Sequence, residues 1–278
     1  MAPRAASPDP ALGLRVRSAL VLVPIALGML LLGPLPSAAL VGVAVALMAL
    51  EWQRLIAARF DPLSGKTAGG AALLGAGAAL ALAAGGWPRE ALMVLVVAVG
   101  LATGVAAWLG ARPLWAGLGV AYLGVPAVAL VWLRSDPERG LGLLIWLLAV
   151  VWAADSFAYL VGRRLGGPKL APRISPGKTW SGLCGGVIGG ALVGGLGVAV
   201  GSSGRTLQAV GLGAALAAVG QVGDLLESAI KRRSGVKDSG GLIPGHGGVL
   251  DRLDSLLLAA PVLALLALLL GPEALLWH

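Results

Sequence analysis

The fold is decided by residues 252–270, RLDSLLLAAPVLALLALLL, an apolar run of the length that one helix needs to cross a bilayer. Residues 224–254 lead into this run and read DLLESAIKRRSGVKDSGGLIPGHGGVLDRLD. They hold five acids and five bases, whereas only 12% of the whole chain is charged. Because charged side chains are costly to place beside hydrocarbon, this concentration predicts a functional site at a membrane surface.

The composition of the whole chain is typical of a membrane protein with several spans. Of its 278 residues, 58% are hydrophobic and 44 are glycine, a residue that lets helix backbones approach closely in lipid. We therefore predict an all-α polytopic membrane protein with about nine transmembrane helices and its active site at the cytoplasmic helix ends. The apolar segments are residues 16–33, 36–53, 68–86, 89–109, 115–133, 141–162, 180–201, 206–230 and 252–270.

The distribution of basic residues supports this count and predicts its orientation. With loops numbered from the N-terminus, 17 of the 21 Lys and Arg residues fall in the N-terminal segment and the even loops. The other four are Arg89, Arg134, Arg139 and Arg205. Since cytoplasmic loops are rich in Lys and Arg, we expect the N-terminus and the even loops on the cytoplasmic side of a bacterial-type inner membrane. Topology thus explains the net charge of +8, and no nucleic-acid partner is expected.

No repeat or soluble domain interrupts the apolar segments, so residues 1–278 are predicted to form a single integral membrane domain. Residues 1–14 resemble a flexible tail, 15–140 form helices without specific motifs, and 141–278 form the catalytic helices and loops. The first apolar segment is long for a signal sequence, and we expect it to remain as a span.

Two of the apolar segments carry residues that are interpreted from their position in the segment. Glu51 and Trp52, near the end of the second segment, are interpreted as a solvated helix end and part of an aromatic belt. The seventh segment, residues 180–201, has glycines in overlapping four-residue spacings, which predicts a close-packed helix interface.

Acidic side chains stand at both ends of the charged stretch. Four polar residues fall at i, i+3, i+4 and i+7 on one helical face: Asp224, Glu227, Ser228 and Lys231. Asp251 and Asp254 begin the last segment, where the helix dipole favours acids. The glycine-rich residues 240–248 between them can bring N–H groups close to phosphate oxygens. Carboxylates without cysteine ligands suit Mg²⁺ and not zinc, so the stretch predicts metal-assisted phosphoryl or nucleotidyl transfer.

A second polar cluster follows the sixth segment. Asp155 lies near the end of that segment, and residues 175–180 read SPGKTW. Gly177-Lys178-Thr179 is similar to the end of a P-loop, but the upstream glycine spacing and the flanking strand are missing, so a true P-loop is rejected. A phosphate-binding loop remains the prediction. Three prolines exclude one continuous helix through residues 163–179.

One residue pattern connects these observations: Ser228-x-Ile230-Lys231-Arg232-x4-Lys237-Asp238-x-Gly240-x2-Ile243-Pro244-x-His246-Gly247-Gly248-x2-Asp251-Arg252-x-Asp254. It resembles the signature of the phosphatidate cytidylyltransferases, also called CDP-diacylglycerol synthases. The stretch from Asp155 through SPGKTW is similar to the family's second block, from which Gly177 and Ser181 depart. The specific resemblance covers about residues 150–256, and the earlier segments match only as apolar spans.

The resemblance implies an integral membrane enzyme that joins CTP and phosphatidate to give CDP-diacylglycerol and pyrophosphate. The implied metal ligands are Asp224 and Asp251, supported by Asp254 and Glu227, and Asp155 is implied as a ligand of a second metal or a polar residue of the cavity. They suit one or two Mg²⁺ ions, and a monovalent cation is compatible with them. The implied catalytic residues are Lys231, Lys237, Asp238, His246 and Arg252. The implied substrate-binding residues are Ser175, Lys178, Thr179, Ser228, Arg232, Gly247 and Gly248. The implied partners are both substrates and membrane lipids, and a homodimer is compatible with the family and the glycine-rich seventh segment.

The chemistry of a phosphate acceptor limits the role of the histidine. A phosphate monoester is already largely ionised at pH 7, so no strong general base is required. We therefore expect His246→Gln to keep measurable activity and Asp251→Asn to abolish it.

Other classes of function remain open at this point. A related transferase or kinase acting on an ether lipid or a polyprenol would share these motifs, because the lipid-facing walls set acceptor choice. A cation-coupled transporter would also place acids in the membrane, but no inverted repeat is visible. A structural scaffold leaves the four acids of residues 224–254 that flank the glycine-rich loop unexplained. Incorporation of labelled CTP into lipid separates the enzyme from the last two classes.

Overall fold

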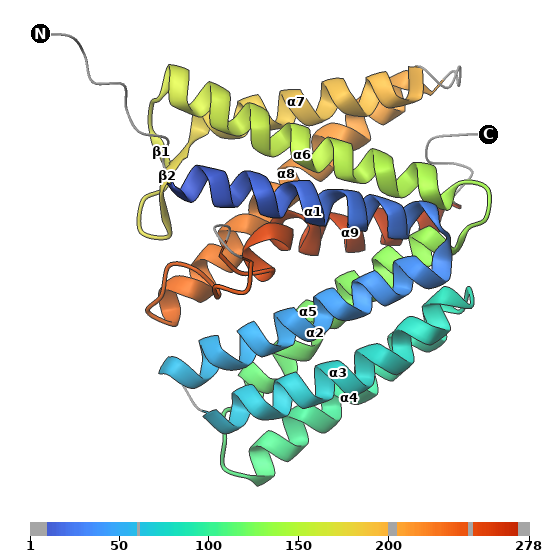
Figure 1. Cartoon of the computed structure of the whole chain (residues 1–278), viewed down its shortest axis with the longest axis vertical. Helices are drawn as coiled ribbons and strands as arrows, with labels where there is room; N and C mark the ends of the chain where they lie inside the picture. Colours follow the sequence, from blue (N-terminus) through green and yellow to red (C-terminus); the bar gives the residue numbers. More distant parts are fainter. Residues whose placement is uncertain (1–9, 60–61, 200–204, 244–246, 272–278) are drawn as a thin grey trace, which may run out of the picture.

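A computed structural model describes residues 10–59, 62–199, 205–243 and 247–271, which form nine α-helices and one small antiparallel sheet (Figure 1). The helices are α1 (Pro10–Leu31), α2 (Pro34–Arg59), α3 (Pro62–Ala84), α4 (Pro88–Trp108), α5 (Pro113–Ser135), α6 (Gly140–Leu165), α7 (Trp180–Ala199), α8 (Thr206–Arg233) and α9 (Leu250–Leu270). The strands β1 (Lys169–Ala171) and β2 (Ser175–Thr179) lie between α6 and α7. The predicted helical membrane fold class is thus confirmed.

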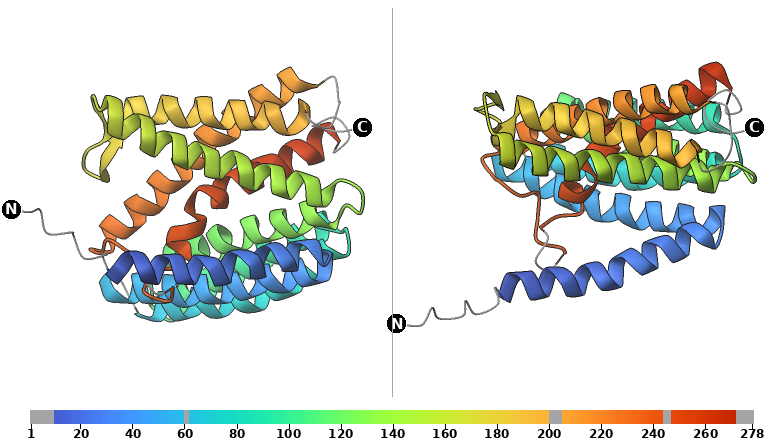
Figure 2. Two further views of the ribbon diagram at one scale, coloured as in Figure 1. Left: turned by 45° about the horizontal axis from the view of Figure 1, so that its top comes forward. Right: turned by 90° about the horizontal axis from the view of Figure 1, so that it is seen from above.

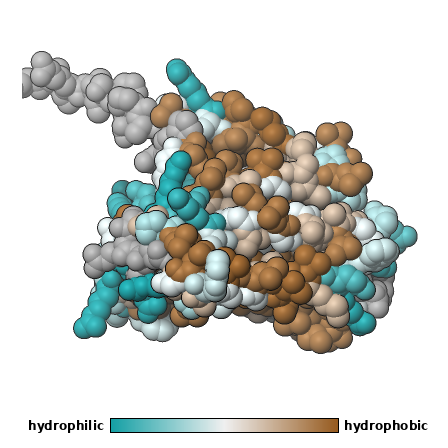
Figure 3. Space-filling view, turned by 90° about the horizontal axis from the view of Figure 1, so that it is seen from below, coloured by the Kyte–Doolittle hydropathy of each residue, from teal (hydrophilic) through white to brown (hydrophobic). Residues whose placement is uncertain are grey.

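The described helices fit a protein that crosses a membrane several times. Eight of them, α2 to α9, are long and apolar enough to span a bilayer, whereas the apolar stretch within α1 is limited to Leu20–Leu31. The helices occupy the nine predicted segments, although α3 begins at Pro62 and not at residue 68. Figure 3 shows apolar residues across the middle of one face and hydrophilic residues at its two ends.

The helices form two groups that meet at α5 and α9 (Figures 1 and 2). Helices α2 to α5 share an apolar core that includes Val45 and Leu123, and the start of α9 joins it through Leu250. A second core joins α6, α8 and α9 and includes Leu147 and Leu263. The hairpin, the end of α8 and the start of α9 lie at one end of the molecule in Figure 1. The two polar stretches of the sequence are therefore brought together at the helix ends.

Trp52 belongs to the first core and not to an aromatic belt, so the interpretation drawn from its position is wrong. The side chain is fully buried. Its ring centroid lies 5.6 Å from that of Tyr122 and 6.3 Å from that of Trp115. Gly119 of α5 faces the indole, and a Cβ at Gly119 would collide with the ring. Trp52 thus fills the contact between α2 and α5.

Helix α7 approaches α6 and α8 through its glycines, as the spacing predicted. A Cβ at Gly186 would lie 2.9 Å from the carbonyl oxygen of Ala154 in α6. A Cβ at Gly190 would lie 2.9 Å from the carbonyl oxygen of Gly213 in α8. This close-packed face is used within the chain, so the homodimer stays a prediction.

Gly213→Ala is expected to lower the free energy of unfolding by about 1–3 kcal/mol, because the added methyl group would collide with the Gly190 carbonyl. Gly211→Ala on the same helix is the matched control, since a Cβ there meets no atom within 4 Å. Unfolding of both variants in detergent measures the difference. Equal stability of the two variants would contradict the close contact of α7 with α8.

Candidate active site

The β1–β2 hairpin reverses the chain at the end of α6 and positions Lys178. Gly166 and Gly167 follow α6 with φ values of +59° and +103°, which residues other than glycine rarely adopt. Strand β2 then pairs antiparallel with β1 and carries both Ser175 and Lys178. The sequence predicted a non-helical loop here, but it did not predict the two strands.

The hydroxyl groups of Thr179 and Ser181, which follow Lys178, form hydrogen bonds with backbone groups. Thr179 is buried, and its Oγ1 accepts a hydrogen bond of 3.1 Å from the N–H of Gly182, as an N-cap of α7 does. The hydroxyl of Ser181 donates to the carbonyl oxygen of Gly166. Ser181 is therefore explained by local structure, and the predicted phosphate contact of Thr179 stays a prediction.

A pocket of about 600 Å³ lies among α6, the hairpin, α7 and α8. Lys178 Nζ lies in its wall, 2.6 Å from Asp224 Oδ2, and donates to Gln221 Oε1 at 3.3 Å. Gln221 Nε2 in turn donates to Asp155 Oδ1 at 3.3 Å. The pocket therefore presents an ammonium group, an amide and two carboxylates along one wall.

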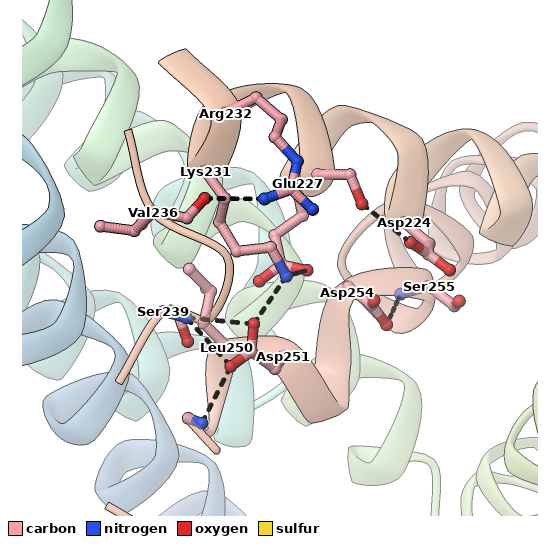
Figure 4. Close-up of polar contacts among 12 residues, drawn as sticks. Asp224, Glu227, Lys231, Arg232, Val236, Ser239, Leu250, Asp251, Asp254 and Ser255 are labelled. Carbon is pink, nitrogen blue, oxygen red and sulfur yellow. Dashed lines mark hydrogen bonds and ion pairs between the residues drawn. The ribbon is translucent and has the colours of Figure 1, made fainter. Parts of the chain in front are cut away.

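Lys231 is the centre of a second cluster, between α8 and α9 (Figure 4). Its Nζ lies 2.6 Å from Asp251 Oδ1 and 3.1 Å from Glu227 Oε2. Glu227 is fully buried, and its Oε1 has no hydrogen-bond partner within the described part of the chain. The ion pair of Glu227 and Lys231 confirms that the two residues share one helical face.

Asp251 joins the start of α9 to the chain that precedes it. Its Oδ2 accepts hydrogen bonds from the N–H groups of Gly248 at 2.9 Å and Ser239 at 3.0 Å (Figure 4). Oδ1 accepts a hydrogen bond from the N–H of Ser239 at 3.2 Å and another from Nζ of Lys231 at 2.6 Å. Both carboxylate oxygens are thus held by donors of this chain.

Asp254 lies within electrostatic range of both clusters. Its carboxylate is repelled by those of Asp224 and Asp155 and attracted by Lys231. Ser255, the next residue, donates its N–H to Asp254 at 2.7 Å and its hydroxyl to Asp155 at 3.4 Å. The five acids predicted as metal ligands therefore gather in one region, although no three described acids form a ready metal cluster.

The other predicted residues lie around these clusters. Ser228 donates to Asp224 Oδ1 at 3.4 Å. Arg232 is exposed and donates to the carbonyl oxygens of Ile174 at 3.2 Å and Val236 at 3.0 Å. The remaining exposed residues are Lys237, Asp238 and Arg252. His246 lies outside the described residues, so its predicted role is a proposal only.

Comparison with known sequences gives the family. A sequence model of the Cytidylyltransferase family matches residues 13–270. The chain belongs to this family. It is a nucleotidyltransferase, and the resemblance seen in the residue pattern is confirmed.

Several bacterial proteins named phosphatidate cytidylyltransferase are similar to this cytidylyltransferase. The one from Pseudomonas aeruginosa is 41% identical over 266 residues, which cover 91% of this chain and 95% of the relative. The one from Brucella abortus biovar 1 is 45% identical over 222 residues, which cover 78% and 79%. The one from Haemophilus influenzae is 47% identical over 145 residues, half of each chain.

Sequence reasoning missed four residues of this cytidylyltransferase site: Glu51, Gln221, Ser239 and Ser255. Glu51 was interpreted as solvated, and this is wrong. Its side chain is fully buried and accepts hydrogen bonds from Ser239, Val249 and Leu250. Helical spacing could have found Gln221, three residues before Asp224. No local signal connects Glu51 with residues almost 200 positions later.

Proposed function

We propose that this chain transfers CMP from CTP to phosphatidate, giving CDP-diacylglycerol and pyrophosphate, in phospholipid biosynthesis. The names of the relatives support this choice of substrates. The observation that carries the proposal is the Lys178–Asp224 pair in the wall of the pocket, beside the Lys231 cluster and at the ends of apolar helices. A water-soluble nucleotide and the phosphate of a lipid can meet at such a position.

The reaction needs charge neutralisation more than proton transfer. An oxygen of the phosphatidate phosphate attacks the α-phosphorus of CTP and forms a new P–O bond. The bond between the α-phosphorus and the oxygen that bridges it to the β-phosphorus breaks, and this oxygen leaves with pyrophosphate. Phosphoryl and nucleotidyl transfer depend mainly on positioning and on electrostatic stabilisation. Lys178 and Lys231 are the buried or half-buried cations of the described site. We propose that Lys178 leaves Asp224 and binds a phosphate of the substrate. Lys231 orients the carboxylate of Asp251.

Mg²⁺ is the cofactor that we propose for this reaction. The residues fit it, because the site offers carboxylate oxygens and the buried Oε1 of Glu227 lacks a partner among the described residues. One or two of Asp224, Asp254 and Glu227 would hold the ion together with substrate phosphates, since no three described acids form a metal cluster. Asp155 and Asp251 would lie beside it, because both oxygens of Asp251 already accept hydrogen bonds from this chain. Mg²⁺ would neutralise the phosphates and orient them.

We also propose that the site faces the cytoplasm of a bacterial cell through the inner membrane. The excess of Lys and Arg in the N-terminal segment and the even loops supports this orientation. The hairpin and the α8–α9 connection carry the site residues and are both even loops. CTP would then reach the site from the cytoplasm, and phosphatidate from the adjoining leaflet.

The proposal is tested with protein purified in detergent and mixed with phosphatidate, CTP and Mg²⁺. We expect CDP-diacylglycerol and pyrophosphate in equal amounts, and neither product without lipid. Product with an ether-lipid phosphate or a polyprenol, but not with phosphatidate, would move the assignment to a related transferase or kinase. No product with any lipid would overturn it.

Lys178→Met is expected to lower kcat/KM about 10–100-fold, because a charge-assisted contact to a substrate phosphate is lost and Asp224 loses the cation that faces it. Arg173→Met is the matched control, since Arg173 is an exposed base in the turn of the same hairpin. Initial rates at varied CTP and varied phosphatidate show which substrate Lys178 holds. Equal effects of the two substitutions would exclude a specific role for Lys178.

A further inference from the structure

The start of α9 receives its cap from a distant helix. The first N–H groups of a helix have no partner within the helix, and an unpaired N–H is costly away from water. Val249 and Leu250 begin α9, and no side chain of the N-cap residue itself covers these groups. Their N–H groups donate instead to the two carboxylate oxygens of Glu51 in α2, at 2.9 Å and 2.8 Å.

Glu51 has the environment of an anion that is held only by neutral donors. Its side chain is fully buried, and no salt bridge to it is formed among the described residues. The hydroxyl of Ser239 adds a third hydrogen bond at 3.2 Å. The positive end of the α9 dipole also favours a carboxylate at this place.

Ser239 connects Glu51 with Asp251. Its hydroxyl donates to Glu51, and its N–H faces both oxygens of Asp251 at 3.0 Å and 3.2 Å. Gly248 lies between the same two carboxylates: its N–H donates to Asp251, and a Cβ there would lie 2.7 Å from each oxygen of Glu51. The carboxylates of Glu51 and Asp251, which are 200 positions apart in the sequence, thus both contact the chain at Ser239 and at Gly248.

We propose that Glu51 is a positioning residue, which holds Ser239, Gly248 and the start of α9 so that the carboxylate of Asp251 meets Lys231. The N-terminal group of helices would then take part in catalysis through Glu51 without contacting substrate. The catalytic consequence rests on the proposed function, whereas the positioning itself does not.

Hydrogen–deuterium exchange of the full-length protein, resolved to single amides, tests the positioning without substrates. Glu51→Gln keeps the size of the side chain but turns one accepting oxygen into a donor, so one N–H at the start of α9 loses its partner. We expect exchange at least about tenfold faster at Val249 and Leu250 and also at Ser239 and Gly248, the two donors to Asp251. The amides of the hairpin, residues 169–179, should keep their rates.

Two further variants complete the exchange test. Ser239→Ala removes only the hydroxyl bond to Glu51, and we expect about threefold faster exchange at the same four amides. It replaces Glu51→Gln if that variant fails to fold. Ser64→Ala is the matched control, because it removes a buried contact with Arg112 that lies in the N-terminal group of helices and should leave these amides unchanged.

Kinetics separate positioning from a purely structural cap. We expect Glu51→Gln to lower kcat of the folded enzyme about tenfold or more, with KM for CTP changed less than about threefold. Glu51→Asp keeps both acceptors on a shorter side chain and should recover part of the rate. Faster exchange confined to Val249 and Leu250, or an unchanged kcat, would overturn the proposal. A wild-type protein that makes no CDP-lipid would refute the proposed function alone, since the exchange result stands by itself.

Discussion

Asp251→Asn is expected to reduce kcat at least about 1,000-fold while the protein remains folded. Asparagine keeps one accepting oxygen but removes the charge that faces Lys231 at 2.6 Å, and its NH2 group would meet the N–H of Gly248 or Ser239. Breaking one side of a buried ion pair typically lowers the free energy of unfolding by about 3–5 kcal/mol, so the fold of the variant is checked beside its rate. Formation of CDP-lipid in single turnovers measures the loss over this wide range.

The control for Asp251→Asn is Asp136→Asn. Asp136 also accepts two backbone N–H groups, from Glu138 at 3.0 Å and Arg139 at 2.7 Å, but it lies just before α6, away from both clusters. Asp136→Asn should keep nearly the wild-type rate. His246→Gln should also keep measurable activity, because no strong base is needed. Complete loss in both Asp251→Asn and His246→Gln would contradict this division of roles.

The fold could be predicted because the bilayer sets one length for every span. Apolar runs of that length marked all nine described helices, although α1 begins, α2 ends and α3 begins six residues outside the predicted segment. The apolar part of α1 is also shorter than predicted. The hairpin could not be predicted in the same way. Its strands are three and five residues long, and SPGKT shows no alternation of apolar and polar residues.

The site could be predicted only as far as its contacts are local or follow helical spacing. Glu227 and Lys231 are four residues apart, so their position on one helical face followed directly, although their ion pair was not predicted. The partners of Asp251 and the pairing of Lys178 with Asp224 depend on how distant segments pack. Glu51 shows the limit most clearly, because an acid near a helix end looks alike whether water or a buried helix terminus surrounds it.

Lys231→Met is expected to lower the free energy of unfolding by about 3–5 kcal/mol, because two carboxylates lose their shared cation. The two acids should not contribute equally. Asp251 keeps the N–H groups of Ser239 and Gly248, whereas Glu227 keeps no partner, since its Oε1 already has none among the described residues. Most of the loss should therefore come from the buried charge of Glu227. Unfolding in mixed micelles measures it.

The double variant Lys231→Met with Glu227→Gln tests whether Glu227 causes most of the lost stability. Removing the charge of Glu227 should recover at least about half of the lost stability, because a neutral amide is far less costly to bury than an unpaired carboxylate. Its activity should stay as low as that of Lys231→Met, since Asp251 still lacks its cation. A double variant no more stable than the single one would place the cost at Asp251. The cluster would then join α8 to α9 through Asp251 alone, and Glu227 would be left with the metal as its proposed role.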